Sequence, residues 1–107
     1  MPNYLVLYRS SVSPGEQMSD PEQAQAGMEL WMTWATKAGE AIGDLGAPVA
    51  GAFSVGKGDL GQPVCGFSIL KADSPTTLTH VLEGHPHLQS PGDPTIEVLE
   101  FLPMPGA

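Results

Sequence analysis

The chain has 107 residues, of which 41% are hydrophobic and 15% charged, so it has the size of one domain and can bury a core. Twelve acidic residues against four scattered basic ones give a formal net charge of −8, which argues against nucleic acid and anionic membrane surfaces as partners. No basic region followed by an apolar run opens the sequence, and no apolar run approaches a membrane span, so we expect a cytoplasmic protein.

The first expected element is a strand from Asn3 to Arg9, because this stretch is rich in Tyr, Leu and Val. Both sets of its alternating side chains are apolar. One face carries Tyr4, Val6 and Tyr8, and the other carries Leu5 and Leu7. A strand that is apolar on both faces is expected at the centre of a sheet.

A long helix is expected after the loop Ser10 to Ser19. Asp20 can cap it, and Pro21 suits the first helical position. Apolar residues then recur at steps of three and four, namely Met28, Trp31, Ala35, Ala38, Ile42 and Leu45. Trp34 lies beside this stripe, where bulky aromatics are typical of a core or a subunit interface. Gly46 is expected to end the helix.

Two strands, 48–55 and 64–72, are predicted to form a hairpin around the loop 56–63. The only cysteine, Cys65, falls in the second of them and is expected to be a small buried residue rather than a nucleophile. A second helix should begin at Ser74-Pro75, and a fourth strand covers 95–103. The chain is thus predicted to be one domain over 1–107, with 102–107 as a loose tail rich in Gly and Pro.

The order βαββαβ predicts an α+β, ferredoxin-like fold, in which a four-stranded antiparallel sheet carries two helices on one face. The uncovered face would expose the apolar residues of the first strand. Burying about 500 Å² there at about 25 cal/mol per Å² is worth about 12 kcal/mol before association costs, which favours a homodimer that stacks two sheets. We expect a cavity between or beside those sheets, where Gly66 and Ser68 on the open face of the third strand would leave room for a ligand.

All three histidines, His80, His85 and His87, lie within eight residues. A His-x-His pair can bind zinc, but a closed site needs four ligands and this turn supplies two, so no metal is expected. An imidazole titrates near neutrality and suits a general acid or base, oriented by a carboxylate such as Asp93, Glu97 or Glu100. The alternative is that the turn only ends a helix, whose carboxyl terminus favours histidine. Both interpretations stay open.

Residues 51–58 (GAFSVGKG) have the spacing of a phosphate loop. Gly58 stands where Ser or Thr would hold magnesium, and a hairpin rather than a helix follows. The glycines are therefore interpreted as turn residues, and no cofactor is expected.

Five stretches of the sequence, PNYLVLYR, WMTWATKAG, GFSILKADS, GHPHL and TIEVLEFLPMP, resemble YCII-related proteins, the group that includes the DGPF-domain proteins. The resemblance covers nearly the whole chain and implies a dimeric α+β barrel. Members of the group include a dechlorinating enzyme that acts on an aromatic ring, for which a His/Asp pair with an amino-terminal histidine is proposed. That pair does not carry over, because the first histidine here is His80, and the DGPF signature is absent. The turn 85–88 (HPHL) does carry over, and in relatives it lies near the cleft mouth.

Two functional hypotheses follow. In the first, the chain is an accessory or regulatory dimeric module that binds a small molecule or serves assembly alone. In the second, it is a cofactor-free isomerase or lyase, such as a dehydrochlorinase, acting on an aromatic or polyketide-like molecule with His85 or His87 as general acid or base. The candidates for the cavity lining are Tyr4, Tyr8, Trp34 and Ser68.

Overall fold

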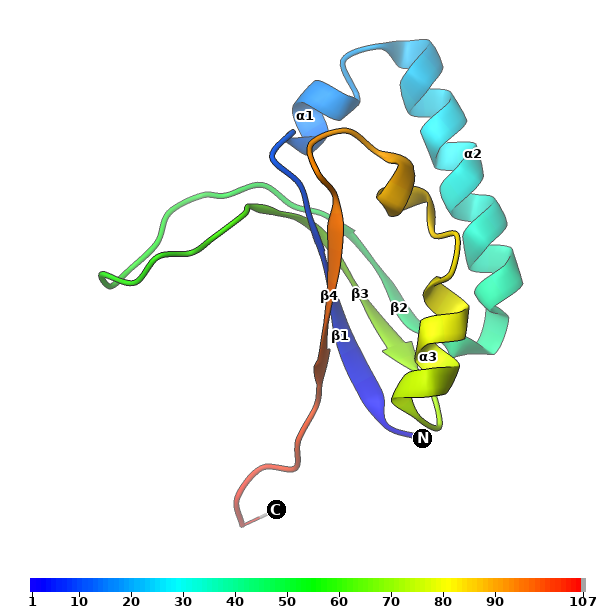
Figure 1. Cartoon of the computed structure of the whole chain (residues 1–107), viewed down its shortest axis with the longest axis vertical. Coiled ribbons are helices and arrows are strands. Elements are labelled where there is room, and N and C mark those ends of the chain that lie inside the picture. Colours follow the sequence, from blue (N-terminus) through cyan, green and yellow to red (C-terminus); the bar gives the residue numbers. More distant parts are fainter. Residues whose placement is uncertain (107) are drawn as a thin grey trace.

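A computed structural model describes residues 1–106. Its four strands form one antiparallel sheet in the order β2-β3-β1-β4, and the helices lie on one face of that sheet (Figure 1). The elements in chain order are β1 (Asn3–Arg9), α1 (Pro14–Gln17), α2 (Pro21–Ala38), η1 (Gly39–Ala41), β2 (Ile42–Pro48), β3 (Val64–Lys71), α3 (Pro75–Leu82), η2 (Pro86–Gln89) and β4 (Thr95–Glu100). The predicted ferredoxin-like α+β fold is confirmed.

The central position of β1 is confirmed, since it pairs with β3 on one side and β4 on the other. Its alternation divides the sheet into two faces. Tyr4, Val6 and Tyr8 are buried beneath the helices, whereas Leu5 and Leu7 are half-buried on the opposite face. We refer to this second side, which no helix covers, as the outer sheet face.

Helices α2 and α3 begin as predicted. The Asp20 carboxylate accepts a hydrogen bond from the main-chain N–H of Glu22, and Ser74 Oγ accepts one from the N–H of Thr77. A proline follows each cap, where its missing N–H costs nothing because the first turn has no acceptor for it. These caps satisfy main-chain donors that the helix itself leaves unpaired.

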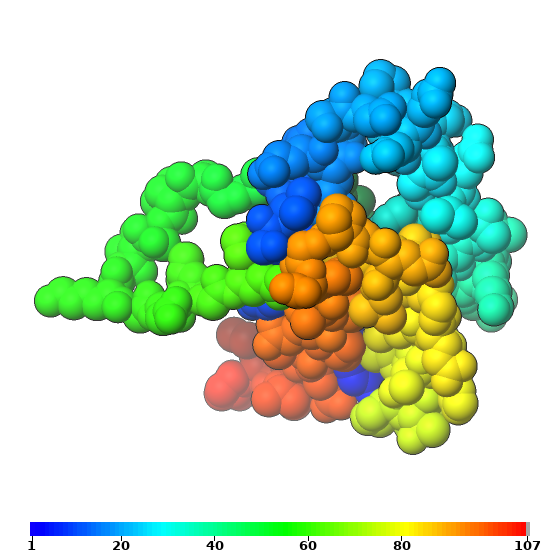
Figure 2. Space-filling view, turned by 45° about the horizontal axis from the view of Figure 1, so that its top comes forward, coloured from blue at the N-terminus to red at the C-terminus, as the bar shows by residue number. Residues whose placement is uncertain are grey.

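The predicted extension of the first helix to Leu45 is wrong, and so is the predicted strand over 48–55. Helix α2 ends at Ala38, Gly39 has a positive φ of 55°, and residues 42–48 form β2. Three glycines between 39 and 46 explain this outcome, because each costs about 1 kcal/mol in a helix interior. The segment 49–63 instead projects from the sheet as a long, almost fully exposed arm (Figures 1 and 2).

The expected position of Gly66 and Ser68 on an open sheet face is also wrong. Ser68 pairs with Val6, and Gly66 pairs with Tyr8, so both lie on the helix-covered face. Ser68 is fully buried. The strand pattern gave the alternation of β3, but only its register against β1 decides which set of side chains faces the helices.

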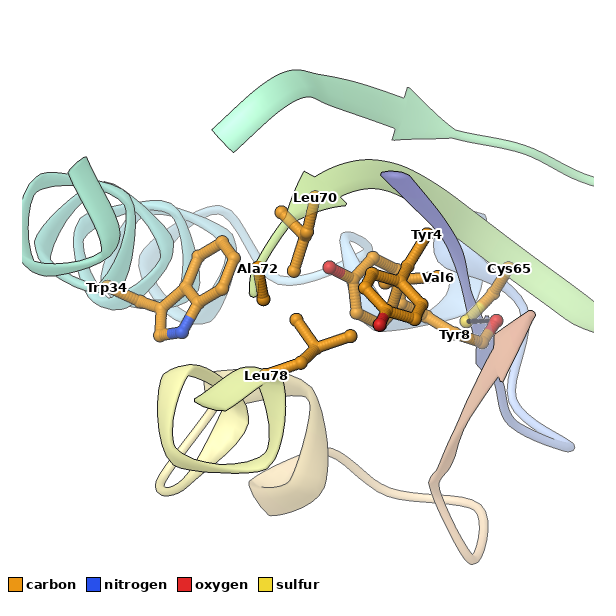
Figure 3. Close-up of a cluster of buried hydrophobic side chains, with 8 residues drawn as sticks. All are labelled: Tyr4, Val6, Tyr8, Trp34, Cys65, Leu70, Ala72 and Leu78. Atoms are coloured by element: carbon orange, nitrogen blue, oxygen red, sulfur yellow. Dashed lines mark hydrogen bonds between the residues drawn. The ribbon is translucent and has the colours of Figure 1, made fainter. Parts of the chain in front are cut away.

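The core lies between the sheet and the helices α2 and α3 (Figure 3). Trp34 from α2 and Leu78 from α3 meet the β1 and β3 side chains there, and Trp34 Nε1 donates to the carbonyl of Val81 at 3.0 Å. Cys65 is buried as predicted, and its thiol donates to the carbonyl of Tyr8. Burial raises the pKa of this thiol, which keeps it protonated.

No helix within residues 1–106 is long and apolar enough to cross a membrane. The carboxyl-terminal residues 101–106 carry exposed side chains and no regular secondary structure. The last residue of the predicted loose tail, Ala107, lies outside the described residues.

Candidate functional site

A cavity of about 580 Å³ opens on the helix side of the sheet. Its walls come from α1 and the residues around it, the first half of α2, the end of β2, the start of β3, and η2. Figure 2 shows the surface hollowed between the α1–α2 segment, in blue, and the η2 segment, in orange. Such a volume is typical of a site for a small organic molecule.

The lining of this cavity is mainly apolar. Its aromatic and sulfur-containing side chains come from Tyr8, Trp31, Met18, Met28, Met32 and Cys65. Its polar members include His87, Glu16, Gln17, Gln23, Gln89 and Ser90. No lysine or arginine lines it in the described part of the chain.

The structure brings together only some of the predicted site residues. Tyr8 and His87 line the cavity. Trp34 and Ser68 are buried in the core and do not line it, and Tyr4 lines a separate hollow of about 110 Å³ beside α3. The cavity also lies on the opposite side of the sheet from the one expected.

The two histidines of the turn after α3 are both buried. Gly84, with φ of 69°, follows the end of α3, and Pro86 then starts η2. His85 is 0% exposed and His87 only 4%. The His85 side chain caps η2, since its Nδ1 accepts a hydrogen bond from the main-chain N–H of His87 at 3.0 Å.

Three aromatic rings enclose the imidazole of His85. Its centroid lies 4.9 Å from that of Tyr8, which stacks on it, 4.5 Å from that of Trp31 and 4.3 Å from that of Trp34. Because Nδ1 accepts a hydrogen bond, the proton of the neutral ring sits on Nε2. Nε2 is buried without a hydrogen-bond partner among residues 1–106.

Burial lowers the pKa of His85 from 6.5 to about 3, and the neighbouring His87 lowers it further in the same direction. A charged imidazole would lose its hydration inside the aromatic enclosure and gain no acceptor there. His85 therefore stays neutral at physiological pH and has no proton on Nδ1 to donate.

His87 uses its ring differently. Its Nε2 lies 2.9 Å from the carbonyl oxygen of Arg9 and 3.1 Å from that of Thr95. A carbonyl oxygen only accepts, so Nε2 must carry the proton and donate to both. Nδ1 forms no hydrogen bond within residues 1–106, and the ring lines the cavity.

Tyr8 contacts His85 and His87 with its ring rather than with its hydroxyl group. The hydroxyl donates to Ser68 Oγ at 2.9 Å, and Ser68 donates in turn to the carbonyl of Leu45 at 2.6 Å. Burial raises the pKa of Tyr8 to about 12, against a smaller opposite effect of the Ser68 hydrogen bond. The phenol is therefore neutral and already occupied as a donor.

Main-chain carbonyls take the place of the carboxylate that was expected to orient a histidine. Among residues 1–106, no carboxylate accepts a hydrogen bond from His85 or His87. Glu97 instead pairs with Arg9 at 3.0 Å, and the exposed His80 pairs with Glu83 at 3.3 Å. Within the same residues, no group of three or more His, Cys, Asp and Glu side chains could hold a metal ion.

The sequence interpretation missed the contribution of the first half of α2. Ala24 and Gly27 line the cavity one turn apart, next to Met28 and Trp31. Their small size leaves space that a larger residue on this face would fill. The sequence feature that could have indicated this cavity wall is the pair of small residues, Ala24 and Gly27, near Trp31 in the helix.

No family model matches this chain. No curated protein matches it either. Among solved structures, it is similar to the 5-chloro-2-hydroxyhydroquinone dehydrochlorinase from Burkholderia phenoliruptrix in complex with 2,5-dihydroxybenzoquinone. The similarity covers 89% of this chain and 90% of that one, with 19% sequence identity and a TM-score of 0.48.

Proposed function

We propose that this chain is a YCII-related domain that binds a small, neutral, planar and largely apolar molecule in the cavity beside Trp31 and His87. The cavity itself carries the proposal, since it joins an apolar wall of sufficient volume to a few polar groups. Aromatic and methionine side chains favour a planar ligand, because they offer flat and adaptable contact surfaces.

The charge of the lining supports a neutral ligand. No described cationic side chain lines the cavity, whereas Glu16 does, and the whole chain carries a formal net charge of −8. An anion entering the cavity would lose its hydration without gaining a counterion. A neutral molecule avoids this cost.

Filling the cavity tests the proposal. We expect Gly27→Leu to weaken the binding of a neutral bicyclic probe, 2-naphthol, at least about tenfold, because a Cβ at this position meets no atom within 4 Å and the leucine would occupy the ligand space. Leucine favours a helix, so α2 should stay folded. Calorimetric titration of both proteins measures the effect.

The matched control is Gln25→Leu, which adds a leucine to an exposed position of the same helix outside the cavity. This variant should bind the probe as the wild type does. Equal binding by wild type, Gln25→Leu and Gly27→Leu would contradict the proposal, and so would the absence of binding by a neutral aromatic probe.

A second candidate function is a cofactor-free isomerase or lyase that uses the same cavity. The observation that favours it is His87, whose Nδ1 could take up a proton from a bound substrate while Nε2 still donates to its two carbonyls. Solvent deuterium exchange at the carbon ortho to the hydroxyl of 2-naphthol, followed by NMR, tests for such proton transfer. Faster exchange with wild type than with His87→Gln supports catalysis, and exchange at the uncatalysed rate supports binding alone.

We also propose that a second copy of the chain covers the outer sheet face. Leu5, Leu7, Phe67 and Ile69 are only half-buried there, and Leu99, which pairs with Leu5, is 44% exposed. Covering this apolar surface would favour a homodimer.

The oligomeric state tests the homodimer. We expect Leu7→Asp to convert a dimer into a monomer, because a carboxylate would be buried against apolar side chains of the partner. Light scattering after size exclusion measures the mass. Leu88→Asp, on η2 and 47% exposed, is the matched control and should remain dimeric. A monomeric wild type would refute the proposal.

A further inference from the structure

We infer that His87 offers an unprotonated Nδ1 to the bound molecule, so that the cavity selects a neutral aromatic ligand carrying a hydroxyl or N–H donor over its methylated analogue. This inference rests on the proposed function, because it specifies the ligand of the same cavity. It assigns a polar recognition element to a site that is otherwise mainly apolar.

The orientation of the His87 ring follows from its two acceptors. Nε2 donates to the carbonyl oxygens of Arg9, at the end of β1, and Thr95, at the start of β4. Turning the ring by 180° would replace Nε2 with a C–H group and lose both hydrogen bonds. The ring therefore keeps its proton on Nε2, and in the neutral form Nδ1 carries a lone pair.

The main chain of His87 is held as firmly as its ring. Its N–H donates to Nδ1 of the buried His85, and its carbonyl accepts from Ser90 Oγ. Together with the two bonds from Nε2, these contacts fix the residue at both the backbone and the side chain. The His87 side chain would therefore lose little conformational entropy when a ligand forms a hydrogen bond to Nδ1.

Three of the neighbouring polar side chains are engaged in hydrogen bonds within the protein. Gln17 Nε2 donates to the carbonyl of Val12, and Ser90 Oγ donates to the carbonyl of His87. Glu16, at the exposed side of the cavity, is another acceptor, and its Oε1 already accepts from Ser13 Oγ. Within the described part of the chain, the Oε1 atoms of Gln17, Gln23 and Gln89 also lack a protein donor. Gln23 and Gln89 are exposed and Gln17 is half-buried, whereas His87 is only 4% exposed, so its Nδ1 is the most deeply placed of these acceptors.

An unpaired acceptor makes the selection strong. A ligand that displaces water from Nδ1 and brings no donor leaves this nitrogen buried and unpaired, which disfavours the complex. A ligand with a hydroxyl group restores the lost hydrogen bond. We expect a preference of at least about tenfold for the donor-bearing ligand, as is usual where a polar group is left unpaired.

The test compares 2-naphthol with 2-methoxynaphthalene, which differ in the donor, by titration calorimetry. Wild type should bind 2-naphthol at least about tenfold more tightly. His87→Phe should lose the preference, and Glu16→Gln should keep it. A preference lost in Glu16→Gln but kept in His87→Phe would assign the acceptor role to Glu16 and overturn the inference.

A measurement on the unaltered protein covers the case in which His87→Phe fails to fold. The nitrogen NMR signal of His87 Nδ1 in wild type should shift on addition of 2-naphthol and stay in place with 2-methoxynaphthalene. If both probes bind equally and neither moves this signal, the inference is wrong while the binding function stands. If neither probe binds, the proposed function itself fails.

Discussion

The free energy of unfolding is expected to fall by several kcal/mol as the pH drops from about 6.5 to about 3, because His85 takes up a proton when the chain unfolds. Its pKa is about 3 in the folded chain and near 6.5 in the unfolded one. Between these values the unfolded state binds the proton and the folded state does not. The stabilisation is therefore complete above pH 6.5 and is lost at up to about 1.4 kcal/mol per pH unit below it.

The structural reason is that protonating His85 in the folded state is energetically unfavourable at either ring nitrogen. The ring is fully buried among Tyr8, Trp31 and Trp34, and Nε2 already lacks a partner. A proton on Nδ1 would face the main-chain N–H of His87 and break the hydrogen bond between them. Burial without a counterion makes the charged ring costly.

Urea unfolding at several pH values between 4 and 7.5 measures this effect against two variants. His85→Phe keeps an aromatic ring and removes the titrating group, so its stability should change much less with pH. At neutral pH it should be less stable by about 1 to 3 kcal/mol, since the N–H of His87 loses its acceptor. His80→Gln, which removes an exposed histidine, should follow the wild type. A His85→Phe profile parallel to the wild type would contradict the assignment.

Local chemistry in the sequence was sufficient for much of the fold. The Asp20-Pro21 and Ser74-Pro75 pairs place the starts of α2 and α3, because a cap and a proline act within a few residues of the chain. The apolar alternation of β1 likewise identifies a central strand. These features depend on neighbours along the sequence.

The geometry of the candidate site depends on contacts between segments that are distant in the sequence. The sequence therefore predicted the site less completely than it predicted the helix starts and the central strand. The histidines were recognised as a cluster, but their separate roles come from partners on other elements. His87 meets carbonyls from β1 and β4, and His85 meets Trp31 and Trp34 from α2. The face of Ser68 was likewise decided by the register of β3 against β1. Neither a motif nor a period in the sequence encodes such pairings.

The segment that forms β2 was predicted as helix for a different reason. A short apolar run can fit either a helix or a strand. Ile42 and Leu45 fit both a helical stripe and a strand, and the helix interpretation gave too little weight to the glycines among them. Register shifts separate Ile42, Asp44 and Ala47 along β2, and Gly46 lies within this irregular stretch with φ of 81°. A bulge of this kind needs a residue that tolerates positive φ.

Gly46→Ala is expected to destabilise the fold by about 3 kcal/mol or more, because two costs combine at this residue. A Cβ at position 46 would approach the carbonyl oxygen of Phe67 in β3, so that β2 must move away from the sheet. The positive φ of 81° adds backbone strain for any residue with a side chain. Urea unfolding measures the loss, and Gly58→Ala is the control, since a Cβ there meets no atom within 4 Å.

The same substitution should also damage the cavity, because this part of β2 forms one of its walls. Leu45, Gly46, Ala47 and Pro48 all line it, and the carbonyl of Leu45 accepts the hydrogen bond that ends the chain from Tyr8 through Ser68. Moving β2 would leave Ser68 without its acceptor and release Tyr8 from its position beside His85. Amide exchange in Gly46→Ala should therefore accelerate at β2 and at the paired β3 residues before global unfolding. Unchanged exchange there, with stability equal to that of Gly58→Ala, would mean that the glycine is not required for the register of this edge.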